Sequence, residues 1–275
     1  SLMNIQSVSC VYFSPTGTTK TVLENIARGI ECPNIEMIDC TKRSLRKELH
    51  FNSELVILGV PVYYGRVPEE VAAYFATFTA HKTPVVPVVV YGNREYEDAL
   101  KELYDITTKQ NFLPVAAAAF IGEHSYSSSL CPIAQGRPDN DDIQKALSFG
   151  NQIKKKVNAL ESLDAMQAIL VPGNVPYVEP KYLLLIKQAR NSISFTPETD
   201  TALCTECGKC AQVCPIEAIS LDDLTKTDKW QCIICFACIK NCPSGARQMK
   251  DQNFGIQIRK LQKICQRRKE PELYI

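Results

Sequence analysis

The chain has 275 residues, and its 31 basic and 30 acidic side chains give a formal net charge of +1 at pH 7. This balance argues against a nucleic-acid-binding protein that works through bulk charge, and an apolar content of 45% argues against disorder. At about 150 residues per domain, the length predicts about two domains.

The unusual feature of the composition is its thirteen cysteines, eight of which fall between Cys204 and Cys242. No apolar run reaches the ~20 residues that span a bilayer, and the N-terminus lacks the basic and apolar regions of a secretory signal. We therefore expect a cytoplasmic protein without a membrane span, whose cysteines serve metal or redox chemistry instead of disulfides.

Residues 3–160 alternate strand and helix patterns, which predicts an α/β domain with a parallel sheet covered on both faces. Strands are expected at 4–13, 35–39, 54–60, 85–91 and 114–121. Helices are expected at 16–30, 68–79, 95–111 and 141–160. Pro87 weakens the fourth strand, and either Asp139 or Asn140 is expected to cap the last helix.

Residues 161–200 are predicted to form a connector, because Pro172, Pro176 and Pro180 interrupt it. A short helix is expected at 181–191, and the apolar run 183–186 predicts that the connector packs against the rest of the chain. The tail at 251–275 has six basic and three acidic residues. A solvated terminal helix is the favoured interpretation of this tail, and a docking patch is the alternative.

Residues 201–250 contain an internal repeat with an offset of 28 residues, and each copy reads C-x2-C-x2-C-x3-C-P. This is the spacing of bacterial ferredoxins with two [4Fe–4S] clusters, in which the fourth cysteine of each run serves the other cluster. One predicted ligand set is therefore Cys204, Cys207, Cys210 and Cys242, and the other is Cys232, Cys235, Cys238 and Cys214. Zinc sites favour paired C-x2-C halves, and disulfides would need an oxidising compartment. The segment resembles the two-cluster bacterial ferredoxin domain.

The first predicted strand runs through Ser14-Pro15-Thr16-Gly17-Thr18-Thr19 directly into a helix. Hydroxyls and free N–H groups at a helix N-terminus favour an anion. Because the chain has neither a G-x4-G-K-[ST] loop nor a G-x-G-x-x-G fingerprint, we interpret this loop as a cradle for one phosphate. A plain helix cap is the alternative.

Two more loops with aromatic residues and glycine follow the third and fourth strands, at 61–68 and 92–96. In an open parallel sheet such loops gather at the carboxyl ends of the strands, where ligands bind. Their aromatic faces suit a flat ring system.

Residues 4–160 resemble the flavodoxin family, whose FMN phosphate loop has the S-x-T-G-x-T pattern of residues 14–19. The resemblance implies a sheet of order 2-1-3-4-5 that binds FMN. It places the phosphate at Ser14, Thr16, Gly17, Thr18 and Thr19. It places the ring at Pro61, Val62, Tyr63, Tyr64, Gly65, Gly92, Asn93 and Tyr96.

The chain departs from ordinary flavodoxins in its balanced charge, which puts the usual basic partners in doubt, and in an extra segment at 122–138. This segment is a candidate cover for the flavin, with His124 or Tyr126 near it, although a hydrogen-bonded loop histidine is the favoured interpretation of His124. Cys131, in the same segment, and the other four cysteines outside the repeat are interpreted as idle thiols.

The whole chain resembles the flavodoxin–ferredoxin fusion proteins of anaerobes, sometimes called the EFR1-type ferredoxin family. The resemblance implies an electron-transfer flavoprotein that holds FMN and two [4Fe–4S] clusters and serves redox partner proteins. An NAD(P)H- or quinone-dependent flavin reductase acting on a small substrate is the main alternative, since flavodoxin-like folds host both kinds. A ferredoxin with a flavodoxin-like domain that has lost its flavin is a third interpretation.

Overall fold

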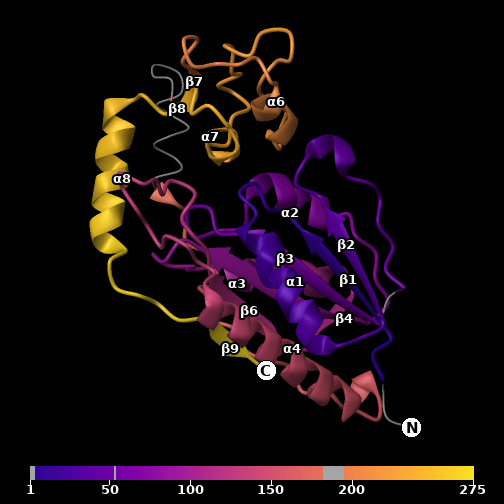
Figure 1. Ribbon diagram of the computed structural model, residues 1–275. Helices are drawn as coiled ribbons and strands as arrows, with labels where there is room; N and C mark the ends of the chain where they lie inside the picture. Colours follow the sequence, from indigo (N-terminus) through magenta and orange to yellow (C-terminus); the bar gives the residue numbers. More distant parts are fainter. Residues whose placement is uncertain (1–3, 53, 182–194) are drawn as a thin grey trace.

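The computed structural model of the protein describes residues 4–52, 54–181 and 195–275, and its largest element is a sheet at the centre of Figure 1. The parallel strands follow the order β2-β1-β3-β4-β6, which is the predicted order 2-1-3-4-5. They are β1 Ser7–Tyr12, β2 Asn34–Asp39, β3 Leu55–Pro61, β4 Thr83–Tyr91 and β6 Ala117–Ile121. The protein therefore has a flavodoxin-like α/β fold with a mainly parallel sheet.

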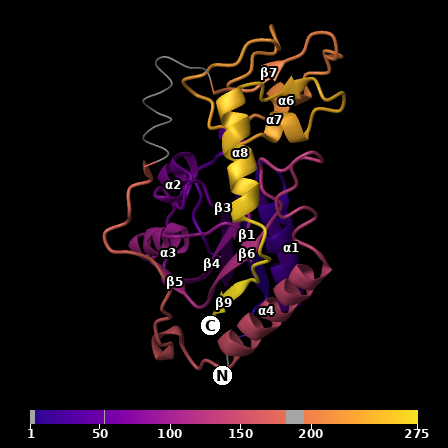
Figure 2. The ribbon, with the colours of Figure 1, turned by 90° about the vertical axis from the view of Figure 1, so that its left-hand side faces the viewer.

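Helices cover both faces of this sheet, as Figure 2 shows end-on. The helices α1 (Thr18–Ile30) and α4 (Asn140–Asn158) pack on one face, and α2 (Glu69–Phe75) and α3 (Ala99–Lys109) pack on the other. In β3, Leu55 and Ile57 join the core under α1 and α4, while the intervening residues join the other core. Burial on both faces explains the continuous apolar run of this strand.

The predicted fifth strand is two segments, β5 (Phe112–Pro114) and β6, and both pair with β4. Pro114 pairs with Val85 and Ala118 pairs with Val88. Between these two pairs, the chain of β5 and β6 has one residue more than β4, as in a β-bulge. The Val85 carbonyl accepts from the N–H of Val115, so Val85 faces the chain of β5 and β6. Alternate residues of a strand bond to the same neighbouring strand, so Pro87 faces that chain too. Because Pro87 has no N–H to donate, the bulge lies where the ladder is interrupted.

A small C-terminal part lies beyond the carboxyl ends of the strands, at the top of Figure 1. It contains α6 (Lys209–Val213), α7 (Ala237–Lys240) and a two-stranded sheet of β7 (Glu198–Thr199) and β8 (Arg247–Gln248). The Arg43 N–H, in the short helix η1 (Arg43–Leu45), donates to the carbonyl of Pro215 at 2.8 Å. From the opposite side, Lys240 donates to the Ser127 carbonyl at 2.7 Å. The two parts therefore share hydrogen bonds at two separate places.

The tail differs from the expected solvated helix. After α8 (Gln252–Ile264), the chain returns to the large sheet and adds β9 (Glu272–Tyr274) antiparallel to β6 (Figures 1 and 2). Charged groups hold the returning segment, because Arg268 reaches Asp139 at 2.7 Å and Glu270 accepts from Lys145 at 2.7 Å. Asp139 also caps α4, since its carboxylate accepts from the Asp142 N–H. The prediction of a solvated tail is therefore wrong for the final strand.

The described part of the connector runs along α3 after a short turn, η2 (Leu163–Ala165). The Asp98 carboxylate accepts from the backbone N–H groups of Asn174 and Val178 at 2.7 and 2.8 Å. The Tyr177 hydroxyl donates to Asp105 at 2.5 Å. The helix expected at 181–191 and the apolar run 183–186 lie outside the described residues, apart from residue 181.

Among the described residues, none of the helices combines the length and the apolar character that crossing a membrane requires.

Candidate functional site

A cavity of about 540 Å³ opens at the carboxyl ends of the strands, within the size range of cofactor sites. Its lining comes from the loops after β1, β3 and β4, the start of the extra segment and α8, together with connector residues 178–181 and with Ile233 and Ile234. The predicted site residues that line it are Ser14, Thr16, Thr18, Thr19, Pro61, Val62, Tyr63, Tyr64, Gly65 and Gly92. The structure thus brings the three predicted loops together around one cavity.

The loop between β1 and α1 is shaped as an anion cradle. Gly17 has a left-handed φ of 90°, and a side chain there would meet nothing within 4 Å. The Ser14 hydroxyl accepts from the Lys20 N–H at 3.1 Å, so this oxygen caps the helix and keeps its own proton to donate. No acidic residue lies in the first turn of α1. The N-terminal N–H groups and nearby hydroxyls therefore fit one terminal phosphate.

The loop after β3 turns sharply, with left-handed φ values of 55° at Tyr64 and 78° at Gly65. The Tyr63 N–H and carbonyl each bond to Arg66, which closes the turn. Burial raises the pKa of Tyr63 well above its usual value, so the phenol stays neutral. The turn presents aromatic side chains to the cavity, as a flat ring requires.

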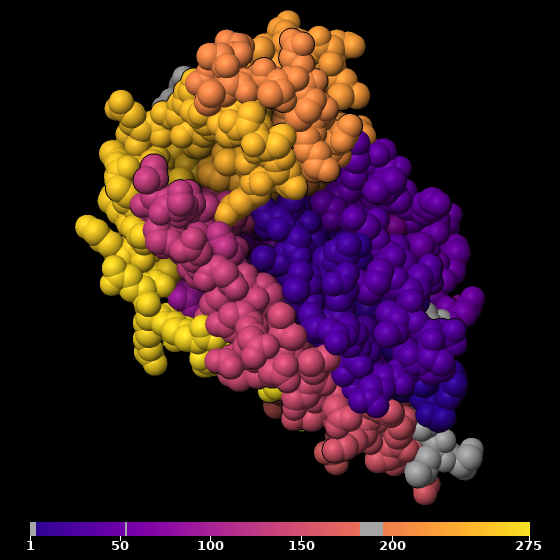
Figure 3. Space-filling view, in the orientation of Figure 1, coloured from indigo at the N-terminus to yellow at the C-terminus, as the bar shows by residue number. Residues whose placement is uncertain are grey.

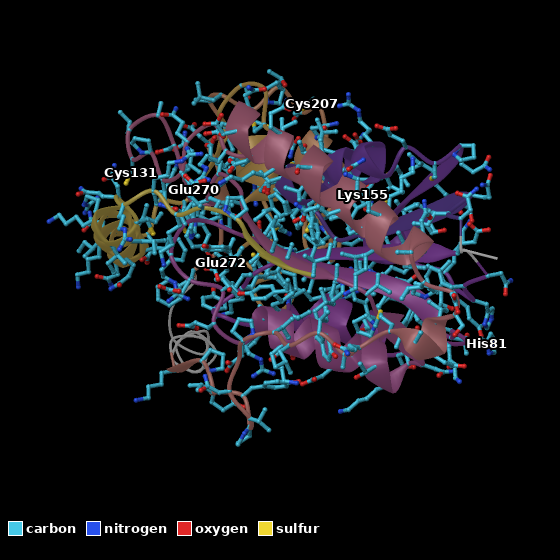
Figure 4. The ribbon with its side chains drawn as sticks, turned by 90° about the horizontal axis from the view of Figure 1, so that it is seen from below. His81, Cys131, Lys155, Cys207, Glu270 and Glu272 are labelled. Carbon is cyan, nitrogen blue, oxygen red and sulfur yellow. The ribbon has the colours of Figure 1, made fainter. Side chains whose placement is uncertain are left out.

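Two predicted ring-binding residues, Asn93 and Tyr96, do not line the cavity, and their side chains bind the C-terminal tail. The Asn93 amide donates to the carbonyls of Cys265 and Arg267 at 2.8 and 2.9 Å and accepts from the Lys269 N–H at 2.9 Å. The Tyr96 hydroxyl bonds to Glu272 at 2.8 Å. Figure 4 labels Glu270 and Glu272 on this tail segment. The structure therefore does not bring these two side chains into the cavity with the other predicted ring-binding residues.

The extra segment contributes both of its candidate residues, His124 and Tyr126, to the cavity. Figure 3 shows the extra segment at the surface, beside the C-terminal part. The His124 Nδ1 accepts from the Tyr126 N–H at 3.0 Å, which leaves the proton of a neutral ring on Nε2. Burial and then the charges of Arg94 and Lys240 lower the pKa of His124 to about 4. His124 packs on Gly92, where any side chain would collide with it. It is thus a hydrogen-bonded loop histidine that also faces the cavity.

The helix α8 forms a wall of the cavity that sequence analysis missed. Phe254, Ile258 and Leu261 line the cavity and follow one another at spacings of four and three residues. Such spacing marks one apolar face of a helix, and it was the available signal. Cys131 lies beside this wall, with its sulfur 4.0 Å from the Ile258 carbonyl (Figure 4).

The eight cysteines of the repeat gather around two further cavities, four at each. Cys204, Cys207, Cys210 and Cys242 line one. Cys214, Cys232, Cys235 and Cys238 line the other. Each cavity therefore takes three cysteines from one repeat and the fourth from the other, which is the grouping that the spacing predicts.

The backbone of the two repeats matches at the same 28-residue offset. Left-handed φ values occur at Glu206 and Ile234, at Gly208 and Phe236, and at Glu217 and Gly245. Such values are rare for branched or bulky residues, and strain of this kind clusters at functional sites. In both repeats this conformation brings an N–H within 3.4 Å of the first cysteine sulfur.

The donor sets fit iron–sulfur clusters, because each offers four thiols that amide groups and apolar side chains surround. Within the described residues, no group of three or more His, Cys, Asp or Glu side chains is arranged to hold a single metal ion. Outside the repeat, burial raises the pKa of Cys10 and Cys40 to about 12, as expected of idle thiols.

The cavity at the sheet edge and one cysteine cavity share a wall. Ile233 and Ile234 line both of them. The Tyr126 hydroxyl donates to the Ile234 carbonyl at 3.1 Å, and its ring lies 4.5 Å from that of Phe236. The cavity of Cys214, Cys232, Cys235 and Cys238 is therefore next to the sheet-edge cavity, and the other cysteine cavity is farther along.

Comparison with known proteins gives two matches to families. Residues 10–128 match the family described as the flavodoxin domain, and residues 196–243 match the 4Fe-4S dicluster domain. None of the curated proteins matches the chain. The two family matches support an electron-transfer protein of flavin and iron–sulfur type.

Among solved structures, a Streptococcus pneumoniae flavodoxin is similar over 55% of this chain and 99% of its own, with 13% identity and a TM-score of 0.40. The Fusobacterium nucleatum flavodoxin bound to flavin mononucleotide covers 55% of this chain and 98% of its own, with 14% identity and a TM-score of 0.37. An NADH:FMN oxidoreductase covers 57% and 92%, with 12% identity and a TM-score of 0.42. These identities are too low to carry a function to this chain.

Proposed function

Because the chain joins an N-terminal flavodoxin domain to a C-terminal 4Fe-4S dicluster domain, we propose that it passes electrons between bound FMN and two [4Fe–4S] clusters. FMN exchanges one or two electrons and each cluster exchanges one, so the combination converts between paired and single electrons. The observation that carries the proposal is the wall of Ile233 and Ile234 between the sheet-edge cavity and a cysteine cavity.

In this proposal the loop at 14–19 binds the FMN phosphate, and the loop at 61–65 and Gly92 bind the ring. The phosphate end is held by N–H groups of α1 and by Thr16, Thr18 and Thr19. No second diphosphate motif is present in the sequence, so FMN is favoured over FAD. The neutral His124 has a proton on Nε2 that it can donate to the FMN in the cavity. The apolar face of α8 keeps water away from the same cavity.

Cys214, Cys232, Cys235 and Cys238 hold the cluster next to the flavin, which we call the proximal cluster. Cys204, Cys207, Cys210 and Cys242 hold the other, which we call the distal cluster. Cys207 is exposed, so the distal cluster lies near the protein surface. The cofactors therefore follow the order FMN, proximal cluster, distal cluster, and a redox partner protein exchanges electrons with the distal cluster.

The hydrogen bonds between the two parts keep this arrangement fixed. Arg43 donates to the Pro215 carbonyl and Lys240 to the Ser127 carbonyl, on either side of the shared wall. At the wall itself, Tyr126 donates to the Ile234 carbonyl and packs against the Phe236 ring. A fixed separation gives a transfer rate that does not depend on protein concentration.

The test is photoreduction of the flavin followed optically at the cluster absorption, at several protein concentrations. We expect a fast phase whose rate is independent of concentration. Cys235→Ser should abolish this phase by removing a proximal ligand, whereas the matched variant Cys207→Ser should retain it. A rate that scales with concentration, or a fast phase that survives Cys235→Ser but not Cys207→Ser, would contradict the proposal.

A further inference from the structure

Arg247 is a buried cation between the two cysteine cavities. Its exposed fraction is 2%, and it lines both cavities. Its guanidinium donates to the hydroxyls of Thr199 and Thr227, both at 3.0 Å, and Nη2 lies 3.6 Å from the Cys238 sulfur. Nε is buried and has no partner among the described residues.

These contacts do not compensate the charge of Arg247. Two threonine hydroxyls and one thiol carry no full negative charge when the cysteine is protonated. A guanidinium stays protonated at every ordinary pH, and a buried charge without a counter-charge is costly. The Nε–H adds an unsatisfied donor to this cost. The buried charge of Arg247 would therefore be compensated by anionic sulfur of the cysteines in the two cavities, as in bound clusters.

The sequence repeat shows that the fold at this position does not require a cation. At the offset of 28 residues, Ile219 corresponds to Arg247. Ile219 is buried, packs in the apolar cluster of the small domain and lines only the cavity of Cys214, Cys232, Cys235 and Cys238. An apolar side chain thus occupies the corresponding position in the first repeat, and the cation of the second repeat needs a separate explanation.

We propose that Arg247 raises the reduction potentials of both clusters by placing its guanidinium between them. This inference rests on the proposed function, because it requires that both cysteine sets hold clusters. Reduction of either cluster adds one electron and one negative charge, and no bond forms or breaks. A fixed positive charge and donated hydrogen bonds stabilise the more negative, reduced form. Arg247 acts only through its fixed positive charge and its hydrogen bonds, and it accepts no electron itself.

An opposite charge within about 4–6 Å shifts the ionisation equilibrium of a group by roughly 10- to 1000-fold, and we apply the same range to the gain of an electron by a cluster. We use the lower end, because the added electron spreads over the cluster. Arg247→Gln should therefore weaken reduction of both clusters by about tenfold, which for a one-electron couple is about 59 mV toward negative potential. Arg247→Lys keeps the charge and should retain most of the wild-type potential.

The experiment is an EPR-monitored redox titration of the full chain, with iron and sulfide measured on each preparation. The matched control is Lys226→Gln, which removes an exposed cation of the same domain that lines none of the three cavities, so both potentials should stay unchanged. Lower potentials of both clusters in Arg247→Gln, with little change in Arg247→Lys, support the inference. If Arg247→Gln fails to load both clusters, a loaded Arg247→Lys protein with near-wild-type potentials supports it.

Unchanged potentials in Arg247→Gln with full iron content would overturn the inference and leave the proposed function standing. A shift in only one cluster, or an equal shift in Lys226→Gln, would also overturn it. Wild-type protein that binds no clusters after anaerobic reconstitution would instead overturn the proposed function.

Discussion

Replacing Asn93 with alanine separates two roles for this residue, because sequence analysis predicts a flavin contact and the structure shows an anchor for the tail. Asn93 is buried, with an exposed fraction of 4%, and its side chain makes three hydrogen bonds to residues 265–269. At about 0.5–1.5 kcal/mol each, the loss of all three weakens the tail by about 1.5–4.5 kcal/mol, with about 3 kcal/mol as the middle of that range.

The residue also has a left-handed φ of 68°, which asparagine tolerates better than alanine. Asn111→Ala is the matched control, because Asn111 has a φ of 67° and donates one hydrogen bond to the Ala80 carbonyl, not to the tail. Any effect of backbone strain should therefore occur in both variants, while release of the tail should occur only in Asn93→Ala.

Hydrogen exchange of the amides in β9, together with titration of the apoprotein with FMN, measures both effects. Since each 1.4 kcal/mol is tenfold, exchange in β9 should accelerate by about 10²-fold in Asn93→Ala. Flavin affinity should fall as a consequence, because the tail holds the C-terminal end of α8, whose apolar face lines the cavity. Weaker flavin binding with unchanged protection of β9 would refute the assignment of Asn93 as a tail anchor.

Three further predictions follow from the site. Cys242→Ser should damage the cluster of Cys204, Cys207 and Cys210, although Cys242 lies in the other repeat; EPR signals assigned to each cluster test this, and damage confined to the proximal cluster would contradict it. Thr16→Ala and Thr19→Ala should each weaken FMN binding by about 1–3 kcal/mol through loss of a phosphate donor, and unchanged affinity in both variants would place the phosphate elsewhere. The pKa of His124 in the folded protein, about 4, lies below its ordinary value of 6.5, so the stability it confers is present above pH 6.5 and is lost as the pH falls toward 4. Urea unfolding should show a loss on the order of 1–2 kcal/mol between pH 7 and pH 5 that His124→Gln lacks, and an equal loss in both proteins would show that other groups cause it.

Local features of the sequence were sufficient to predict the features of this protein that depend on nearby residues. The cysteine spacing predicts two ligand sets with exchanged fourth members, and the two cavities contain these sets. A tight loop and a short helix separate the ligands of each run, so the spacing itself restricts where the sulfurs point. The alternation of strands and helices likewise predicts a parallel sheet covered on both faces, because parallel strands require crossover helices. The order of the strands, which the structure confirms, came from the resemblance to flavodoxins.

The tertiary structure determined what depends on residues far apart in the chain. Asn93 precedes its partner Cys265 by 172 residues, and no local pattern at 92–96 distinguishes a flavin contact from an anchor for such a distant segment. The same holds for β9, whose three residues become a strand only because β6 offers an unpaired edge. In the sequence, Arg247 cannot be distinguished from the other basic residues in and near the tail. Only the packing of the two repeats buries its charge between the cysteine cavities, because burial and the distance between charges are properties of the folded chain.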